Sequence, residues 1–206
     1  MRDSRLSDLK KRVAREAAIL LYTSQEKEYK QAKNRAAQTL GARVLPSNLE
    51  VAEELDKIAE EREGRSRQER LLQMRREALR VMELLRRFHP KLIGSVWRGT
   101  AYKNSDIDIV TFSSAPKAVL AELQKSNFKI AKSGWLSVTK RGRKEASFHI
   151  HLILQSGDEV EVVVRSPERI ELKERCETYG DLVTGLSYPR LQRVLEENPL
   201  QKFAPM

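Results

Sequence analysis

The hydrophobic periodicity of the chain changes at Pro90, and this change constrains the fold more than any other feature. Before Pro90, apolar residues recur every three or four positions, as they do on one face of a helix. After Pro90, short apolar runs of the kind found in strands are separated by turns and by shorter helical patterns. The sequence therefore predicts a protein of mixed class, α+β or α/β, whose N-terminal part is entirely helical.

The part before Pro90 predicts several helices. The first two patterns run over residues 6–20 and 22–40, and Gly41 is a plausible C-terminal stop. Ser47 and Glu50 have the spacing of a capping box, so we expect a third helix to begin there and to end near Gly64. On this basis we divide the chain into a helical N-terminal region, 1–65, and a second domain, 66–206.

A further helix is expected over residues 66–88, and it carries a heptad seam. The apolar residues of the seam are spaced three and four positions apart: Leu71, Met74, Ala78, Val81, Leu85 and Phe88. We expect the seam to pack within its own domain. The alternative is a homodimer through helix 66–88, although little more than two heptads is short for a coiled coil.

The part after Pro90 predicts strands over 91–95, 106–112, 148–154 and 160–165, with weaker candidates at 128–130 and 135–138. Residues 155–159 contain a glycine and read as the loop of a hairpin between the last two strong strands. Helices are expected over 115–126, from Pro167, and from about Pro189 to Glu197.

The charge of the chain favours a polyanionic partner. The formal net charge is +10, and residues 1–47 hold 11 Lys and Arg against 5 Asp and Glu. The basic stretch 140–144 is a second candidate for contact with a nucleic-acid backbone. The alternative is a solvated surface rich in ion pairs, and no RNA-binding motif with stacked aromatic residues is present.

Hydropathy and cysteine content indicate the location of the protein and exclude some kinds of site. No apolar run approaches the roughly 18 residues that a membrane span needs, and the N-terminus leads into charged helix, so we expect a cytoplasmic protein. The single cysteine, Cys176, excludes an internal disulfide and a zinc site built from cysteines.

Two aspartates indicate where the chemistry lies. Asp106 and Asp108 are two positions apart in a strand, so their side chains point to the same face. Like charges this close repel each other, and an apolar strand is a poor place for them without a cation. Because both ligands are carboxylates, the expected cation is Mg²⁺, which also binds substrate phosphates.

A phosphate site is expected just upstream. Gly94 ends a strand and lets the backbone approach a phosphate closely, and Ser95 adds a small hydroxyl group. Arg98 follows, and its guanidinium can bind phosphate through two hydrogen bonds. Together with the aspartates, this predicts a site for a nucleoside triphosphate with Mg²⁺.

The string from Gly94-Ser95 through Arg98-Gly99 to Ser105-Asp-Ile-Asp108 resembles the signature of the polymerase-beta-like nucleotidyltransferases, close to the minimal nucleotidyltransferase type. The resemblance is specific over residues 92–112, and a weaker one connects the chain with tRNA CCA-adding enzymes. It implies a nucleotidyltransferase-type mixed sheet flanked by helices, and it says nothing about residues 1–65; with the helical N-terminal region read from the periodicity, the expected fold class is α+β.

The resemblance also implies a third carboxylate on a later strand, where the family usually has Asp. Glu161 is the best candidate because it lies within an apolar strand, and Asp158 and Glu159 are the alternatives. Asp106, Asp108 and Glu161 are thus the expected catalytic and metal-binding residues. Glu161 would also deprotonate the attacking hydroxyl. Gly94, Ser95 and Arg98 would bind the triphosphate, and up to two Mg²⁺ ions are implied.

Two histidines precede the third carboxylate. His149 and His151 alternate with apolar residues, so both face away from the apolar side of their strand, and His151 could contact phosphate or the acceptor. A zinc site is not expected, since no cysteine or further histidine completes the ligand set.

The sequence therefore predicts an enzyme that transfers a nucleoside monophosphate from a nucleoside triphosphate to a hydroxyl on RNA. One alternative is adenylylation of a protein partner, as by antitoxin-like minimal nucleotidyltransferases. The other is a non-catalytic module that binds RNA or a partner and has kept the fold.

Overall fold

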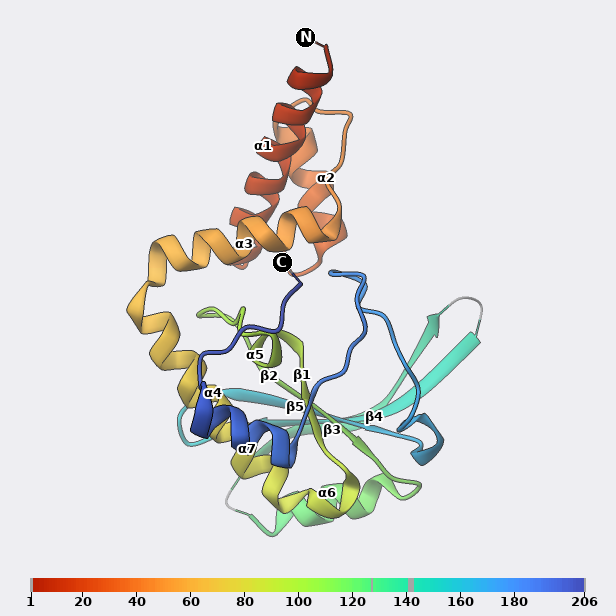
Figure 1. Ribbon diagram of the computed structural model, residues 1–206. Helices are drawn as coiled ribbons and strands as arrows, with labels where there is room; N and C mark the ends of the chain where they lie inside the picture. The colour runs from red at the N-terminus through yellow and green to blue at the C-terminus, as the bar shows by residue number, and fades with distance from the viewer. Residues whose placement is uncertain (1, 127, 141–142, 206) are drawn as a thin grey trace.

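The computed structural model describes residues 2–126, 128–140 and 143–205 (Figure 1). The first part of the chain forms helices α1 (Arg2–Tyr22), α2 (Tyr29–Thr39), α3 (Asn48–Glu63) and α4 (Arg65–Leu84), followed by a 3-10 turn, Arg86–Phe88. The second part forms β1 (Lys91–Ile93), α5 (Gly94–Arg98), β2 (Ile107–Phe112), α6 (Pro116–Gln124), β3 (Lys129–Lys140), β4 (Arg143–Ile153), β5 (Glu159–Arg165), a 3-10 turn (Pro167–Arg169), β6 (Leu186–Ser187) and α7 (Tyr188–Glu197).

The described strands form one mixed sheet in the order β3-β4-β5-β2-β1-β6. Strands β2 and β5 pair in parallel, and the other neighbours are antiparallel. Helices α4, α6 and α7 lie along one face of this sheet, below it in Figure 1. The expected α+β class, with a helical N-terminal region and a mixed sheet flanked by helices, is confirmed.

The strand alternation decides which residues reach the site. On β5, Val160, Val162 and Val164 are buried in the main hydrophobic core, together with Ile107 and Ile109 of β2. The intervening residues of the same strands point to the opposite face, because successive side chains of a strand alternate. The helix-covered face thus holds the core, and the opposite face is left for the polar site.

The N-terminal helices form a second hydrophobic cluster above the sheet. It is built from α1, α2 and α3 and does not share its buried residues with the main core. Tyr22 stacks on Tyr102 with ring centroids 5.8 Å apart, and Asn104 donates a hydrogen bond to the Tyr22 carbonyl. These contacts join the helices to the loop before β2. The boundary between 1–65 and 66–206 as folding units stays a prediction.

Most expected helix ends are confirmed. The Ser47 hydroxyl accepts a hydrogen bond from the Glu50 N–H, and the Glu50 carboxylate accepts one from the Ser47 N–H, so the capping box is present. Helix α3 ends at Gly64 as expected.

Three local expectations were wrong. Residues 94 and 95 begin helix α5 instead of ending a strand, and Pro167 opens only a 3-10 turn. The two weak strand candidates are one long strand, β3, because continuous pairing with β4 outweighs their weak propensity.

The heptad seam of α4 packs inside the chain. Its apolar residues from Leu71 to Phe88 are all buried in the main core. The seam is therefore used by the chain's own fold and offers no surface for the homodimer alternative.

None of the described helices combines the length and the apolar composition that a membrane crossing requires. Residues 141–142 of the basic stretch 140–144 lie outside the described residues, so its contact with nucleic acid stays a prediction.

Candidate active site

Three carboxylates meet on the open face of the sheet. Asp106 immediately precedes β2, Asp108 lies within it, and Glu161 of β5 is the direct parallel partner of Asp108. The pairing of β2 with β5 thus brings together residues that are more than fifty positions apart in the chain. The structure places all three predicted carboxylates side by side, and their role as metal ligands stays a prediction.

Burial and mutual repulsion favour the neutral forms of the two aspartates. Burial, followed by the charges of Asp106 and Glu161, raises the pKa of Asp108 to about 8. Burial also raises the pKa of Asp106; the charges of Glu161 and Glu159 add to that effect, while His151 opposes it. A cation bound here would relieve this repulsion.

Gly94 touches the carboxylate pair directly. Its φ angle is +71°, and an added Cβ would lie 1.9 Å from Oδ2 of Asp108, so only glycine fits. Ser95 follows in the first turn of α5, and Ile93 at the N-cap provides no side-chain hydrogen bond to that turn. The carboxylates and the first N–H groups of α5 therefore lie next to each other.

A buried arginine holds α5 in this position. Arg75 of α4 is fully buried, and its guanidinium donates to the carbonyls of Val96, Trp97, Pro199 and Gln201. No carboxylate of the described residues pairs with it, and burial lowers the pKa of Arg75 to about 10. This one side chain ties α4, α5 and the C-terminal segment together.

Arg98 has a different partner from the one the sequence predicted. It is buried, and it donates two hydrogen bonds, of 2.6 and 3.0 Å, to the carboxylate of Asp181. Its guanidinium also lies over the rings of Trp97 and Tyr179. The guanidinium is thus committed to the fold of the C-terminal loop, and the expectation that it binds triphosphate loses its geometric basis.

The two alternatives for the third carboxylate lie at the loop before β5. Asp158 is buried, pairs with Arg70 at 3.1 Å and accepts hydrogen bonds from Gln73 and Ser156. Its charge is therefore compensated within the fold. Glu159 is exposed at the start of β5, two residues from Glu161, and its charge reaches Asp106.

The histidines of β4 contact the third carboxylate. His149 Nδ1 lies 2.8 Å from Oε1 of Glu161, and His151 Nε2 lies 3.3 Å from the same oxygen. The sequence placed both histidines on the face of Glu161, and the structure brings them into contact with it.

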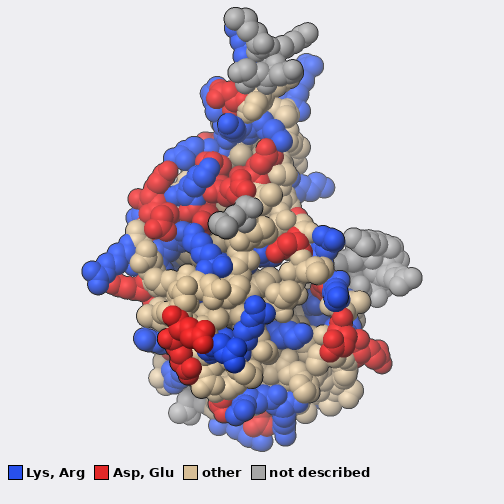
Figure 2. Space-filling view, viewed as in Figure 1, with Lys and Arg blue, Asp and Glu red and all other residues tan. Residues whose placement is uncertain are grey.

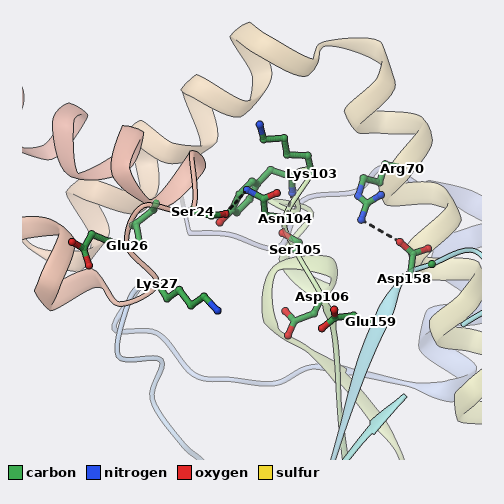
Figure 3. Close-up of a pocket in the computed structure, with 13 residues that line it drawn as sticks. Ser24, Glu26, Lys27, Arg70, Lys103, Asn104, Ser105, Asp106, Asp158 and Glu159 are labelled. Atoms are coloured by element: carbon green, nitrogen blue, oxygen red, sulfur yellow. Dashed lines mark hydrogen bonds and ion pairs between the residues drawn. The ribbon is translucent and has the colours of Figure 1, made fainter. Parts of the chain in front are cut away.

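Two cavities flank the carboxylates. The larger, about 590 Å³, lies between the N-terminal helices and the sheet (Figure 3), and Asp106 and Glu159 lie in its wall. Lys27, from the loop between α1 and α2, extends toward the space beside these carboxylates, and Lys103 lines the same cavity. Neither lysine forms an ion pair with another residue that the structure describes.

The smaller cavity, about 180 Å³, begins at Gly94 and Ser95 and is lined by Tyr29, Tyr102 and Tyr179. These tyrosines and the two lysines could not be predicted as site residues from the sequence, because they come from three distant segments that only the fold brings together.

On the face of the molecule that Figure 2 shows, basic and acidic side chains are interspersed. Figure 2 shows basic and acidic side chains next to each other over the N-terminal helices. Lys10 pairs with Glu50 of α3, and Arg15 contacts Glu54 and Glu61 of the same helix. Part of the positive charge of residues 1–47 thus serves internal ion pairs.

Comparison with known proteins agrees with this geometry. Residues 91–181, which contain the three carboxylates and Gly94, match the family model of the nucleotidyltransferase domain. This part of the chain is therefore similar to nucleotidyltransferase domains of the polymerase-beta-like type, and the resemblance of the signature string is supported. No curated protein matches the chain.

Among solved structures, the chain is similar to the Cid1 poly(U) polymerase, with 21% identity and a TM-score of 0.34 over 45% of this chain and 30% of that one. A second similarity is to Cid1 in complex with the UTP analogue UMPNPP, with 21% identity and a TM-score of 0.36 over 57% and 37% of the two chains. The chain spans only about a third of the length of these polymerases, and likeness at this level carries no argument about substrate.

Proposed function

We propose that the protein transfers a nucleoside monophosphate from a nucleoside triphosphate to a hydroxyl group on RNA, and that the reaction depends on Mg²⁺. The observation that carries the proposal is the fit between Gly94 and Asp108. The Asp108 carboxylate occupies the space in which a side chain at position 94 would begin. The backbone at Gly94, which can approach a phosphate closely, thus lies against the Asp108 carboxylate, whose charged form a bound cation would stabilise.

The donor set fits Mg²⁺. Asp106, Asp108 and Glu161 offer only carboxylate oxygens, which are the ligands that this hard cation prefers. Burial raises the pKa of Asp108, the charges of Asp106 and Glu161 raise it further, and a divalent ion would relieve that repulsion. When bound, up to two Mg²⁺ ions would neutralise the triphosphate and stabilise the attacking and leaving oxygens.

The chain's own residues supply positioning and proton transfer. The Ser95 hydroxyl and the first N–H groups of α5 would bind phosphate oxygens beside the carboxylates. The Glu161 carboxylate would accept the proton of the attacking hydroxyl. His149 and His151 contact Oε1 of Glu161 and would keep that carboxylate oriented.

The choice of RNA as acceptor is supported by the larger cavity. Lys27 and Lys103 line it beside Asp106, and neither is paired with a carboxylate of the described chain. A hydroxyl at the end of an RNA chain brings phosphates with it, and lysines without a carboxylate partner beside the site would bind them; Lys103 also lies over the Tyr22 ring, 4.6 Å from its centroid. A cytoplasmic location, where RNA and nucleoside triphosphates are both available, stays part of the proposal.

The test is a transfer assay with several acceptors. The full chain would be incubated with each labelled ribonucleoside triphosphate, Mg²⁺, and either cellular RNA or cell lysate. We expect label in RNA, and we expect none with the double variant Asp106→Asn/Asp108→Asn or with EDTA. Label in a protein band would favour the protein-adenylylation alternative, and nucleotide binding without transfer would favour the non-catalytic module.

The RNA contact has its own test. Lys27→Gln should weaken RNA binding and lower the slope of log affinity against log salt by roughly one contact. Lys30→Gln, an exposed lysine of α2 outside the cavity, is the matched control. An equal slope in the wild type and Lys27→Gln would remove this residue from the proposed RNA path.

A further inference from the structure

We propose that His149, His151 and Glu161 bind a first-row transition-metal ion such as Zn²⁺, at a site beside the Mg²⁺ carboxylates Asp106 and Asp108. The three side chains each offer one ligand atom, and these atoms all lie within 4.8 Å of one another. The sequence argument against zinc counted cysteines and histidines only. The structure supplies the missing ligand as the carboxylate of Glu161.

The distances suit a single ion. Metal–nitrogen and metal–oxygen bonds of about 2.0–2.1 Å place neighbouring ligand atoms about 2.9–3.4 Å apart, depending on whether the ion is octahedral or tetrahedral. Oε1 of Glu161 lies 2.8 Å from His149 Nδ1 and 3.3 Å from His151 Nε2. These two distances suit an ion shared by Glu161 and either histidine, and the two imidazole nitrogens lie within 4.8 Å of each other, so the side chains can close around one ion.

The strands place the ligands without help from a loop. His149 and His151 are two positions apart on β4, so both point to the open face of the sheet. His151 is the direct antiparallel partner of Glu161 on β5, and His149 is its diagonal neighbour. Ligands mounted on paired strands are held more rigidly than ligands on loops.

A second observation points to a metal. The hydroxyl of Ser147 lies 2.8 Å from Nε2 of His149, the ring nitrogen that does not face Glu161. Histidine ligands of metals commonly donate the other ring N–H to a neighbouring acceptor, which fixes the tautomer and the ring plane. Ser147 provides this acceptor, on the same strand and the same face.

The ligand types determine the class of ion. Imidazole nitrogens suit Zn²⁺ and its first-row neighbours, whereas Mg²⁺ prefers oxygen ligands. The side chains of His149, Glu161 and His151 are 17, 25 and 31% exposed, so an ion can enter and can keep water among its ligands. Oε2 of Glu161 forms no hydrogen bond within the described chain, so Oε1 can bind the transition-metal ion while Oε2 stays available to Mg²⁺ and to the proton of the attacking hydroxyl.

Cobalt titration tests the site without any assay of transfer. The full chain, stripped with a chelator, would be titrated with Co²⁺ in excess Mg²⁺, and the visible absorption of bound Co²⁺ would be followed. We expect one tightly bound ion per chain. His149→Gln and His151→Gln should each weaken binding at least tenfold, and Ser147→Ala should weaken it by about tenfold.

The chain offers matched controls. Its third histidine, His89, is exposed and lies outside the cluster, and its φ angle of 51° suits asparagine, so His89→Asn should bind Co²⁺ as the wild type does. The double variant Asp106→Asn/Asp108→Asn should also keep Co²⁺ binding, while it loses Mg²⁺-dependent nucleotide binding. This second control separates failure of the histidine site from failure of the proposed function.

Two outcomes would overturn the proposal. One is equal Co²⁺ affinity in the wild type and in a His151→Gln protein whose circular dichroism shows it to be folded. The other is loss of Co²⁺ binding in Asp106→Asn/Asp108→Asn with retention in both histidine variants, because the ion would then occupy the Mg²⁺ carboxylates.

Discussion

Two regions next to Gly94 bury charge in opposite ways. Where α4 meets α5, Arg75 is fully buried, and its donors are used by four backbone carbonyls. On the open face of the sheet, Asp106, Asp108 and Glu161 gather three carboxyl groups, and burial together with their mutual repulsion raises the pKa of Asp108 to about 8. One region compensates its charge within the chain, and the other leaves it to be compensated from outside.

This difference distinguishes a charged group that stabilises the fold, Arg75, from charged groups that we propose bind a cation, the three carboxylates. A buried polar group that is fully hydrogen-bonded can stabilise the position of neighbouring elements. Like charges held together cost stability, so a fold retains them only where a cation or a substrate uses them. Gly94 lies between the two regions, since it begins the helix that Arg75 holds and touches the carboxylate of Asp108.

The largest effect on stability is expected at the arginine. Arg75→Met should lower the free energy of unfolding by about 3–5 kcal/mol, because buried carbonyls that lose their donor cost about 1–3 kcal/mol each and water can reach only some of them. Chemical denaturation measures this change. Arg76→Met, the exposed neighbour, is the control and should change stability little. If both variants are equally stable, Arg75 does not hold the α4–α5 junction.

The glycine between the two regions comes next. Gly94→Ala should destabilise the protein by about 2–4 kcal/mol, since alanine is strained at positive φ and its Cβ would displace the Asp108 carboxylate. Nucleotide affinity should fall as well, as calorimetry would show. Gly134→Ala, on β3 with open space around it, should leave both quantities unchanged. Normal nucleotide affinity in Gly94→Ala would contradict the contact that carries the proposed function.

Glu161→Gln tests whether the third carboxylate is functional. Glutamine keeps the shape of the side chain, so folding and triphosphate binding should survive, while transfer should drop by roughly a hundredfold or more. Thermal midpoint, nucleotide affinity and transfer rate would be measured together. Glu159→Gln, at the exposed start of β5, is the matched control. Loss of transfer only in the control would move the role two residues upstream.

The smallest effect is expected from the pH dependence of Asp108. Its pKa in the folded protein, about 8, lies above the ordinary aspartate value, so the contribution of Asp108 to the stability of the metal-free protein is complete at low pH and is lost as the pH rises to about 8. Asp108→Asn removes this loss. Such a shift corresponds to about 5 kcal/mol for an isolated group, but Asp106 and Asp108 titrate together, so the effect of Asp108 alone is smaller. In EDTA, the variant should match the wild type near pH 4 and exceed it by about 1–2 kcal/mol at pH 8 and above, or roughly 2–8 °C in thermal midpoint.

Two controls accompany that measurement. Mg²⁺ should raise the midpoint of the wild type most at high pH, because the ion replaces a proton at Asp108. Asp8→Asn, on the exposed surface of α1, should show no such gap. A gap between Asp108→Asn and the wild type that narrows with rising pH would show that the sign of the shift is wrong.

Local patterns in the sequence predicted much of the fold. The capping box at Ser47 and Glu50 marked the start of α3, and period-two alternation marked β2, the end of β4, and β5. The carboxylates Asp106 and Asp108 could be predicted as a pair because two positions on one strand suffice to bring their side chains together.

The sequence could not show contacts between residues that are distant in the chain. Arg98 was expected to bind phosphate, and its pairing with Asp181, more than eighty residues away, could not be predicted. Glu161 meets the two histidines only through the pairing of β4 with β5, so the cluster that we propose as a transition-metal site could not be predicted either. Lys27 reaches the larger cavity only because α1 and α2 stand over the sheet.

The sequence by itself determined the local features of the protein. These are the places where helices and strands begin, the apolar face of each strand, and the short string of residues that is expected to bind metal and nucleotide. These features depend on neighbours within a few residues, whose geometry the backbone alone prescribes. Only the tertiary structure decided which strand pairs with which and in what register. That register sets Asp108 beside Glu161 and His151 beside the same carboxylate, and it results from packing of the whole core, which no local spacing encodes.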